Sequence, residues 1–314
     1  IRDSTRAIYN AYRASFDRNQ AAALALVLVL VTVLVLYFES KARGQKFAVG
    51  KIANRLGRTD LGPWKTPMFL LLVVLAAVSL LIPLGSLTLW SIQGFAGTDW
   101  AQVLEALSNS VLLAVSGGLV TSIAAMTIAV VTIRHRFRVA SVLERSVWLT
   151  HATPGIVVAL SLVFFSNQVA PWIYQTTWLL LIAYLALFLP NALAAVSTPI
   201  RQSPKALDEV SSSLGLSAMQ TLRKVVLPIA GPGIFAATTL VILTVLKELP
   251  ATLLLRPTGM ETLATRLWTE TSVAAFSAAA PYALLLVVLA GFPAWLLNRA
   301  IRRDLEPMEM ERYQ

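Results

Sequence analysis

Seven runs of apolar residues, separated by polar stretches, dominate this sequence. They lie at 21–38, 67–90, 111–133, 147–165, 178–196, 229–246 and 281–297. Each run is close to the length of about 20 residues that an α-helix needs to cross a bilayer. The pattern therefore predicts an all-α polytopic membrane protein in which each run is one transmembrane helix.

The run at 147–165 is the least regular of the seven. Its first half is interrupted by residues 151–155, whose sequence is HATPG. Proline and glycine are tolerated in membrane helices where neighbouring groups satisfy the freed backbone, and they often mark helices that bend around a pathway. Pro154 and Gly155 are therefore candidate pathway residues, and a simple kink is the alternative interpretation.

Composition and charge narrow the class of protein further. The chain of 314 residues is 57% hydrophobic and only 13% charged, whereas about a quarter of the residues in a soluble domain are charged. A net charge of +10 would suit a nucleic-acid ligand, but the basic residues lie in short loops beside apolar runs, as in a membrane protein. We therefore expect membrane lipid, and no nucleic acid, as a partner. Without cysteine and with two histidines, the chain has little material for a transition-metal site.

The basic residues also predict the orientation of the chain. They gather after the third run (134–145), between the fifth and sixth runs (201–224) and after the last run (299–303). The loops 91–104 and 166–177 contain no lysine or arginine. Because cytoplasmic loops carry the excess of these residues, we expect a multi-pass protein with a cytoplasmic C-terminus.

A polar stretch of mixed charge at 203–228 separates the fifth run from the sixth, and it predicts two short helices. In the first, Asp208 and Glu209 fall in the early turns, where the helix dipole favours negative charge. Gly215 suits the left-handed backbone conformation that ends a helix. Ser217 is suited to cap a second short helix, which ends before the next apolar run.

The same stretch resembles the signature of permeases of ATP-binding-cassette (ABC) importers. That signature is Glu-Ala-Ala, a glycine four residues after the last alanine, and then Ile-x-Leu-Pro. The corresponding positions are Glu209, Val210, Ser211, Gly215, Val225, Leu227 and Pro228. Val210 and Ser211 replace the two alanines, so the agreement lies in the spacing, the Glu, the Gly and the Leu-Pro. The resemblance implies that 203–228 docks on an ATPase; an ordinary amphipathic surface helix is the alternative.

The order of the apolar runs is similar to that family as well. Six runs follow the linker, with the signature between the fourth and fifth of them. The resemblance implies a six-helix type I ABC importer permease core at 67–300, in the bacterial plasma (inner) membrane. We expect residues 1–38 to be the outer loop and last transmembrane helix of a preceding, similar half. In this interpretation residues 39–66 form a basic cytoplasmic linker and residues 301–314 a cytoplasmic tail.

Two further stretches look like segments of ferric-iron permeases, some of which fuse two such halves in one chain. They are KELPATLLLRP at 247–257 and TPGIVVALSL at 153–162. The resemblance implies a permease for ferric iron, with permeases for sulfate, thiamine, polyamine or phosphonate as the alternatives. A more remote alternative is an ion-coupled secondary transporter, which needs carboxylates within the membrane; these runs hold almost none.

Lys247 and Glu248 are the charged candidates for the pathway, because ionisable groups near membrane depth are often functional. The alternative is an interfacial pair whose lysine reaches water. No catalytic triad, metal cluster or nucleotide-binding glycine loop stands out, so we expect no catalytic site and no cofactor. The resemblance implies two protein partners: cytoplasmic ABC ATPase subunits, which hydrolyse the ATP, and an extracytoplasmic substrate-binding protein.

Overall fold

Helices account for all the regular structure in the part of the chain that the computed structural model describes. This part comprises residues 62–134, 153–202 and 206–310, with five further residues between 26 and 34. The longer helices are α3 (Lys65–Gly94), α4 (Trp100–Arg134), α6 (Gly155–Val169), α7 (Thr177–Gln202), α10 (Leu227–Leu246) and α13 (Phe276–Met310). The shorter ones are α8 (Ala206–Ser213), α9 (Ala218–Thr221), α11 (Pro250–Leu255) and α12 (Leu263–Ser272). The predicted leading helix and linker lie largely outside the described residues.

Five helices of the described part are long and apolar enough to cross a membrane. They are Gly62–Gly97, Trp100–Arg134, Thr177–Gln202, Ala218–Leu246 and Phe276–Trp295. Each corresponds to a predicted run, but polar residues extend the helices beyond the apolar stretches. α4 begins at Trp100 rather than at residue 111, and α13 continues to Met310 through most of the predicted tail.

The limits of the fourth predicted span are corrected by the structure. α6 begins at Gly155 and ends at Val169, a length of 15 residues, in place of a helix over 147–165. Residues 147–152 lie outside the described part. Pro154 has an extended backbone (φ −60°, ψ 140°) and lies at the N-cap, so this proline starts the helix instead of kinking it.

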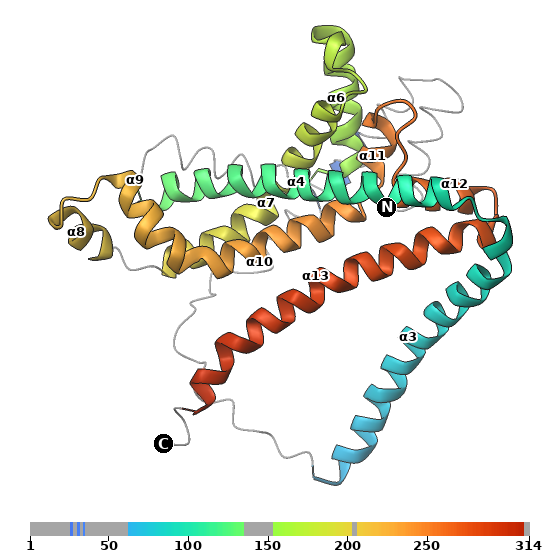
Figure 1. The fold of residues 1–314 in the computed structure, drawn as a ribbon, viewed down its shortest axis with the longest axis horizontal. Helices are drawn as coiled ribbons and strands as arrows, with labels where there is room; N and C mark the ends of the chain where they lie inside the picture. The colour runs from blue at the N-terminus through green and yellow to red at the C-terminus, as the bar shows by residue number, and fades with distance from the viewer. Residues whose placement is uncertain are drawn as a thin grey trace.

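α4, α7 and α10 form the centre of the molecule (Figure 1). Their facing surfaces bury a cluster of aliphatic side chains around Tyr184. Glycine allows the helices to approach closely, because a Cβ atom on Gly118 of α4 would overlap Cγ1 of Ile242 in α10. Lipid tails are as apolar as these side chains, so close packing of this kind is what holds membrane helices together.

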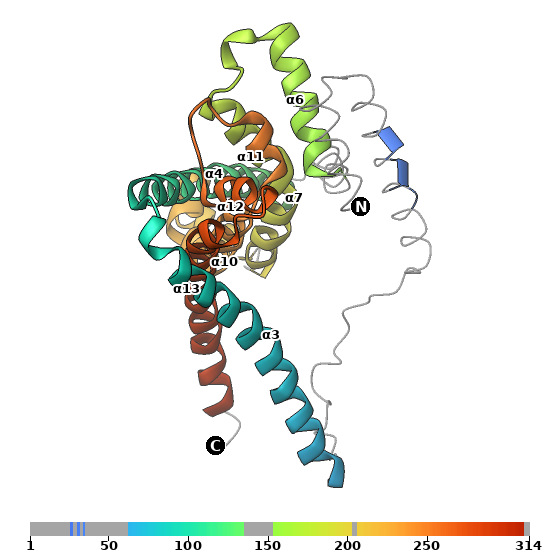
Figure 2. The same cartoon turned by 90° about the vertical axis from the view of Figure 1, so that its right-hand side faces the viewer.

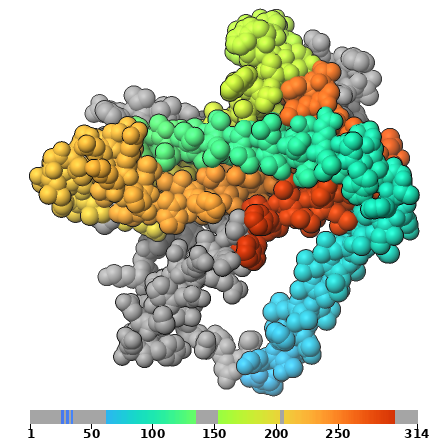
Figure 3. Space-filling view, in the orientation of Figure 1, coloured from blue at the N-terminus to red at the C-terminus, as the bar shows by residue number. Residues whose placement is uncertain are grey.

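α3 stands apart from this centre. It meets α13 near its own C-terminal end, where a Cβ atom on Gly94 would overlap the carbonyl oxygen of Ser277. From there its other end leads away from the bundle (Figures 2 and 3). None of its residues is buried. A helix that is apolar all round and exposed over most of its length suits contact with lipid or with another protein.

Candidate functional site

The predicted docking segment 203–228 is the first candidate site; its residues 203–205 lie outside the described part, and residues 206–228 are described. Its helix α8 protrudes at one end of the bundle (Figure 1). Ser211 is the buried residue of α8, and its hydroxyl donates a hydrogen bond to the carbonyl oxygen of Leu207. A small residue thus fills the third position of the Glu-Ala-Ala signature. Glu209 and Val210, at the first two positions, are exposed.

The turn after α8 has the predicted conformation. Gly215 has a φ of +78°, in the left-handed region that glycine adopts at the least cost. The N–H of Leu216 donates to the carbonyl oxygen of Ser211 over 3.0 Å. A second bond of 3.0 Å joins the Gly215 N–H to the carbonyl oxygen of Ser212, which completes a Schellman motif. Ser217 then caps α9, so the predicted turn and second cap are confirmed.

The second short helix does not end as predicted. α9 continues through the π-helical turn η5 (Leu222–Val226) directly into α10, so one helical path runs from Ala218 to Leu246. Pro228 has no N–H to donate to the preceding turn, and the helix widens beside it. Val225 and Leu227 are half-buried at this junction, and Pro228 is exposed. The closing residues of the signature therefore join α9 to a spanning helix.

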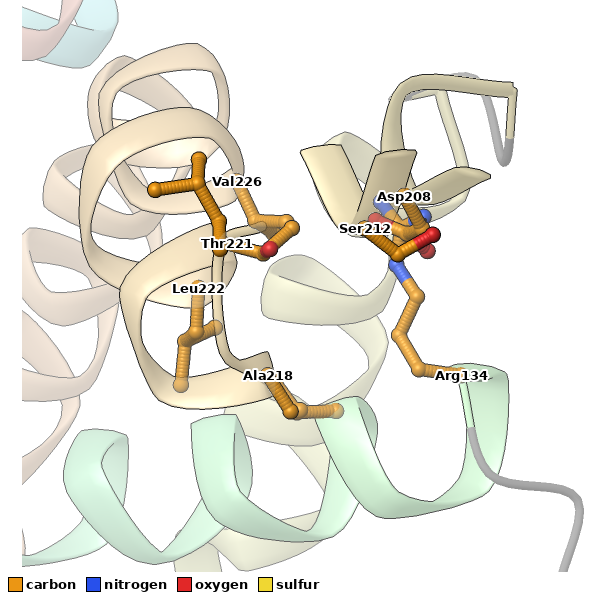
Figure 4. A pocket seen from close by; sticks show the side chains of 9 residues that line it. Arg134, Asp208, Ser212, Ala218, Thr221, Leu222 and Val226 are labelled. Atoms are coloured by element: carbon orange, nitrogen blue, oxygen red, sulfur yellow. The ribbon is translucent and has the colours of Figure 1, made fainter. Parts of the chain in front are cut away.

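An ion pair ties the same segment to the end of α4. The guanidinium group of Arg134, the last residue of α4, donates to the carboxylate of Asp208 in α8. The side chain of Arg134 is 7% exposed and that of Asp208 is 34% exposed. Both border a cavity of about 280 Å³, whose walls include Leu222 and Val226 (Figure 4). No pattern in the sequence predicts this pair, because the two residues are 74 positions apart.

The second candidate site brings together residues that the sequence singled out separately. A Cβ atom on Gly155 would lie 3.2 Å from Oε1 of Glu248. Glu248 lies just beyond the end of α10, and its carboxylate accepts a hydrogen bond of 3.1 Å from the N–H of Ala251, at the start of α11. Burial raises the pKa of the Glu248 carboxyl, and this hydrogen bond opposes the rise. The Glu248 side chain thus contacts the start of α6 and caps α11.

Lys247 and Glu248 do not act as a charged pair. Lys247 is exposed at the C-cap of α10, whereas Glu248 is half-buried beside Gly155. Among the described residues, the structure records no ion pair between them. Of the four predicted pathway residues, Glu248 and the neighbours Pro154 and Gly155 therefore form one cluster, and Lys247 lies outside it.

A buried hydrogen bond fixes α11 to the centre of the bundle. The Tyr184 hydroxyl of α7 lies 2.7 Å from Oγ1 of Thr252 in α11. The Thr252 hydroxyl donates to the carbonyl oxygen of Glu248 over 2.8 Å, so the tyrosine is the donor in the first bond. This chain of bonds holds the Glu248 backbone in place.

The loop between α11 and α12 is held by a network at the opposite end of α4 from Arg134. Arg256 forms an ion pair with Glu261 and donates to the carbonyl oxygen of Met260 over 2.7 Å. The Thr265 hydroxyl also donates to the Glu261 carboxylate, over 2.7 Å. Burial alone would raise the pKa of Glu261, but the hydrogen bonds and charge of Arg256, together with Thr265, lower it below its ordinary value.

Two contacts attach α4 to this loop. Nδ2 of Asn109 donates to the carbonyl oxygen of Glu261 over 3.0 Å. The N–H of Leu263 donates to the hydroxyl oxygen of Ser110 over 2.8 Å, and this bond is buried.

Within the described residues, no group of three or more histidine, aspartate or glutamate side chains is placed to hold a metal ion.

Comparison with known families decides the class. Residues 117–303 match the family of binding-protein-dependent transport system inner membrane components. The chain belongs to this family. The permease is therefore a transport component of the inner membrane that crosses it several times. This agrees with the spacing of the signature in the segment 206–228.

Relatives of known description support the same class. The Fe(3+)-transport system permease protein FbpB 2 of Haemophilus influenzae is 35% identical over 302 residues, which cover 94% of this chain and 60% of that protein. The permease thus spans about 60% of that relative's length. The putative 2-aminoethylphosphonate transport system permease protein PhnV of Salmonella typhimurium is 28% identical over 156 residues, covering 50% of the permease and 59% of that protein.

A solved structure has the same fold. It is a bacterial alginate ABC transporter in complex with an alginate pentasaccharide-bound periplasmic protein. One of its chains superposes with a TM-score of 0.59 at 17% identity, and the match covers 77% of the permease and 95% of that chain. The predicted all-α fold of an ABC importer permease is therefore confirmed.

Proposed function

We propose that the permease is the transmembrane component of an ATP-driven importer of ferric iron. The observation that carries this proposal is the 35% identity to an Fe(3+)-transport permease over 94% of the chain. The two stretches that resemble ferric-iron permeases also meet in space, where Gly155 lies beside Glu248. Residues 1–38 and 39–66 are, in this proposal, the end of a preceding half and the linker that follows it.

The segment 206–228 is the surface that we assign to the ATPase subunit, which hydrolyses the ATP. Its exposed side carries the Glu209 carboxylate together with the apolar side chains of Val210, Leu214 and Met219, of which Leu214 is 76% exposed. Exposed apolar groups gathered on a protruding end are typical of a docking surface. Because α9 is continuous with α10, a displacement of this surface moves a spanning helix directly.

Orientation follows from this assignment. The end of the bundle that carries the segment 206–228 is cytoplasmic, and Arg134 and Arg201 lie in the last turns of α4 and α7 at that end. The α11–α12 loop then faces outward, where an extracytoplasmic binding protein delivers the ion. The C-terminus of α13 is cytoplasmic in the same arrangement.

Transport in this proposal is a change between two states of the bundle. Closure of the ATPase subunits on ATP displaces the docked segments, and the helices alternate between outward-open and inward-open arrangements. The cluster of Pro154, Gly155 and Glu248 lines the passage, where one carboxylate offers a weak oxygen ligand to a cation. Weak binding suits a pathway, because the ion must leave as readily as it enters. The binding protein supplies the specificity.

A phosphonate importer is the second candidate, because a putative 2-aminoethylphosphonate permease is 28% identical over half of the chain. An ionised Glu248 carboxylate would argue against it, since a negative charge in the passage repels a phosphonate group. The same objection applies to a sulfate permease, because sulfate is also an anion.

The test is reconstitution of the complete permease in lipid vesicles with its ATPase and binding protein. We expect ATP-dependent uptake of ferric ion that excess 2-aminoethylphosphonate does not reduce. Uptake of phosphonate or sulfate in place of iron would reject the iron assignment and leave the importer intact. Failure of the permease to bind any ATPase subunit would reject the importer assignment as well.

A further inference from the structure

α8 is attached to the described part of the bundle at two main places. Among the described residues, α9 is the one element against which α8 packs extensively. The Arg134–Asp208 ion pair is a second link, and it reaches a different spanning helix from the one that α9 enters. The Asp208 carboxylate contacts Arg134, while the side chain of its neighbour Glu209 is exposed. Of these two adjacent carboxylates, that of Asp208 therefore contacts the bundle, and that of Glu209 is accessible to a partner.

α4 is well suited to carry a displacement along its length. Its 35 residues contain no proline, whereas α7 and α10 both have prolines within them. Arg134 and Ser110 are separated along this helix by about 36 Å, at a rise of about 1.5 Å per residue. At the far end, Asn109 and Ser110 hold the α11–α12 loop through hydrogen bonds to Glu261 and Leu263.

We propose that Arg134 and Asp208 are positioning residues that transmit the motion of the docked segment to α4, and through α4 to the α11–α12 loop on the opposite side. The side chain of Arg134 is almost fully buried, and its pair with the carboxylate of Asp208 helps to compensate the buried charge. A displacement of α8 therefore pulls the end of α4 with it. This inference rests on the proposed function, because the motion comes from the ATPase.

Charge reversal tests the pair in the complete permease with its ATPase and binding protein. We expect Arg134→Glu and Asp208→Arg each to retain bound ATPase but to lose uptake by about tenfold, a typical size for coupling between sites. The double variant, in which the charges are exchanged, should recover most of the uptake. Glu105→Arg is the matched control, since Glu105 is exposed on the same helix, and it should transport normally.

A second measurement separates transmission from a merely structural role. Thr258 is exposed in the α11–α12 loop, and the chain has no cysteine, so Thr258→Cys gives a single reporter thiol. Its labelling rate by an impermeant thiol reagent should change when ATP binds the wild-type complex. In the Arg134→Glu background the rate without ATP should be the same, and the change on ATP binding should disappear.

The third test joins the two positions covalently. The double variant Arg134→Cys and Asp208→Cys lacks the ion pair, so its uptake should be low, and a short bifunctional thiol reagent that joins the two positions should restore it. No recovery of uptake on cross-linking would overturn the proposal, as would normal uptake in either reversed variant or no recovery in the exchanged one. Wild-type complexes that bind no ATPase would instead reject the proposed function, so the two failures are distinguishable.

Discussion

Gly233 of α10 lies directly against the ring of Pro199 in α7. A Cβ atom on this glycine would be 2.5 Å from Cγ and 2.6 Å from Cβ of the proline. A proline ring cannot rotate aside as a flexible side chain does. The contact brings two spanning helices together where the chain leaves α7 for the segment 206–228 and returns in α10.

Gly233→Ala should therefore destabilise the permease by about 1 to 3 kcal/mol, the usual cost of overpacking a close contact. Thermal unfolding of the purified protein in detergent measures the effect. Gly231→Ala, in the same helix, is the matched control, because no neighbouring atom lies within 4 Å of the Cβ atom that it adds. Equal stability of the two variants would contradict the close contact.

Gly215→Val should uncouple the permease from its ATPase. At a φ of +78° a β-branched side chain costs about 1 to 2 kcal/mol of backbone strain, which alters the angle between α8 and α9. We expect the variant to insert in the membrane and to lose ATPase stimulation and uptake. Gly215→Asn tolerates the left-handed conformation and should retain most activity. If valine is as active as asparagine, the turn does not set the docking geometry.

Glu248 can be tested with two variants that separate its charge from its capping hydrogen bond. Glu248→Gln keeps an oxygen that accepts from the Ala251 N–H, and Glu248→Ala removes both charge and acceptor. If the carboxylate serves the cation, both variants should lose ferric uptake, and only the alanine variant should also lose about 1 kcal/mol of stability. Normal uptake by the glutamine variant would leave Glu248 with a capping role alone.

The Arg256–Glu261 ion pair predicts a dependence of stability on pH. The folded-state pKa of Glu261 lies below its ordinary value of 4.5, so its contribution is present above that pH and is lost as the pH falls through the lowered pKa. Glu261→Gln should be less stable than wild type by about 1 to 2 kcal/mol at neutral pH. The two proteins should converge as the pH falls through the lowered pKa of Glu261.

The stabilities of Glu261→Gln and wild type can be compared by their thermal unfolding midpoints in detergent, measured from neutral to acid pH. Glu105→Gln serves as the control, because Glu105 is exposed; it should match wild type at every pH. A difference between Glu261→Gln and wild type that is constant from neutral to acid pH would show that the ion pair is not its cause.

Labelling of introduced cysteines tests the orientation. Ser217→Cys in the turn before α9 and Asn167→Cys near the end of α6 are both exposed, and the chain contains no other cysteine. An impermeant thiol reagent should reach Ser217→Cys from the cytoplasmic side alone and Asn167→Cys from the outer side alone. The reverse pattern would invert the orientation and remove the segment 206–228 from the ATPase.

Features that depend on neighbours along the chain could be predicted from the sequence. The five spans were located because the thickness of a bilayer requires about 20 apolar residues in succession. The Gly215 turn and the Ser217 cap were also predicted, since each depends on the backbone preferences of one residue and on bonds within a few positions. The same local rules ended the second short helix too early, because the π-helical turn at Leu222–Val226 lets the helix continue into α10.

Features that depend on contacts between distant residues were decided by the tertiary structure. The sequence marked Gly155 and Glu248 as separate candidates, but only the packing of α6 beside α11 puts the Glu248 carboxylate next to Gly155. Asp208 lies in the first turn of α8, as predicted, but only the fold shows that it also pairs with Arg134. An ion pair between residues 74 positions apart produces no pattern in the sequence, because its energy depends on distance in space and on burial rather than on spacing along the chain.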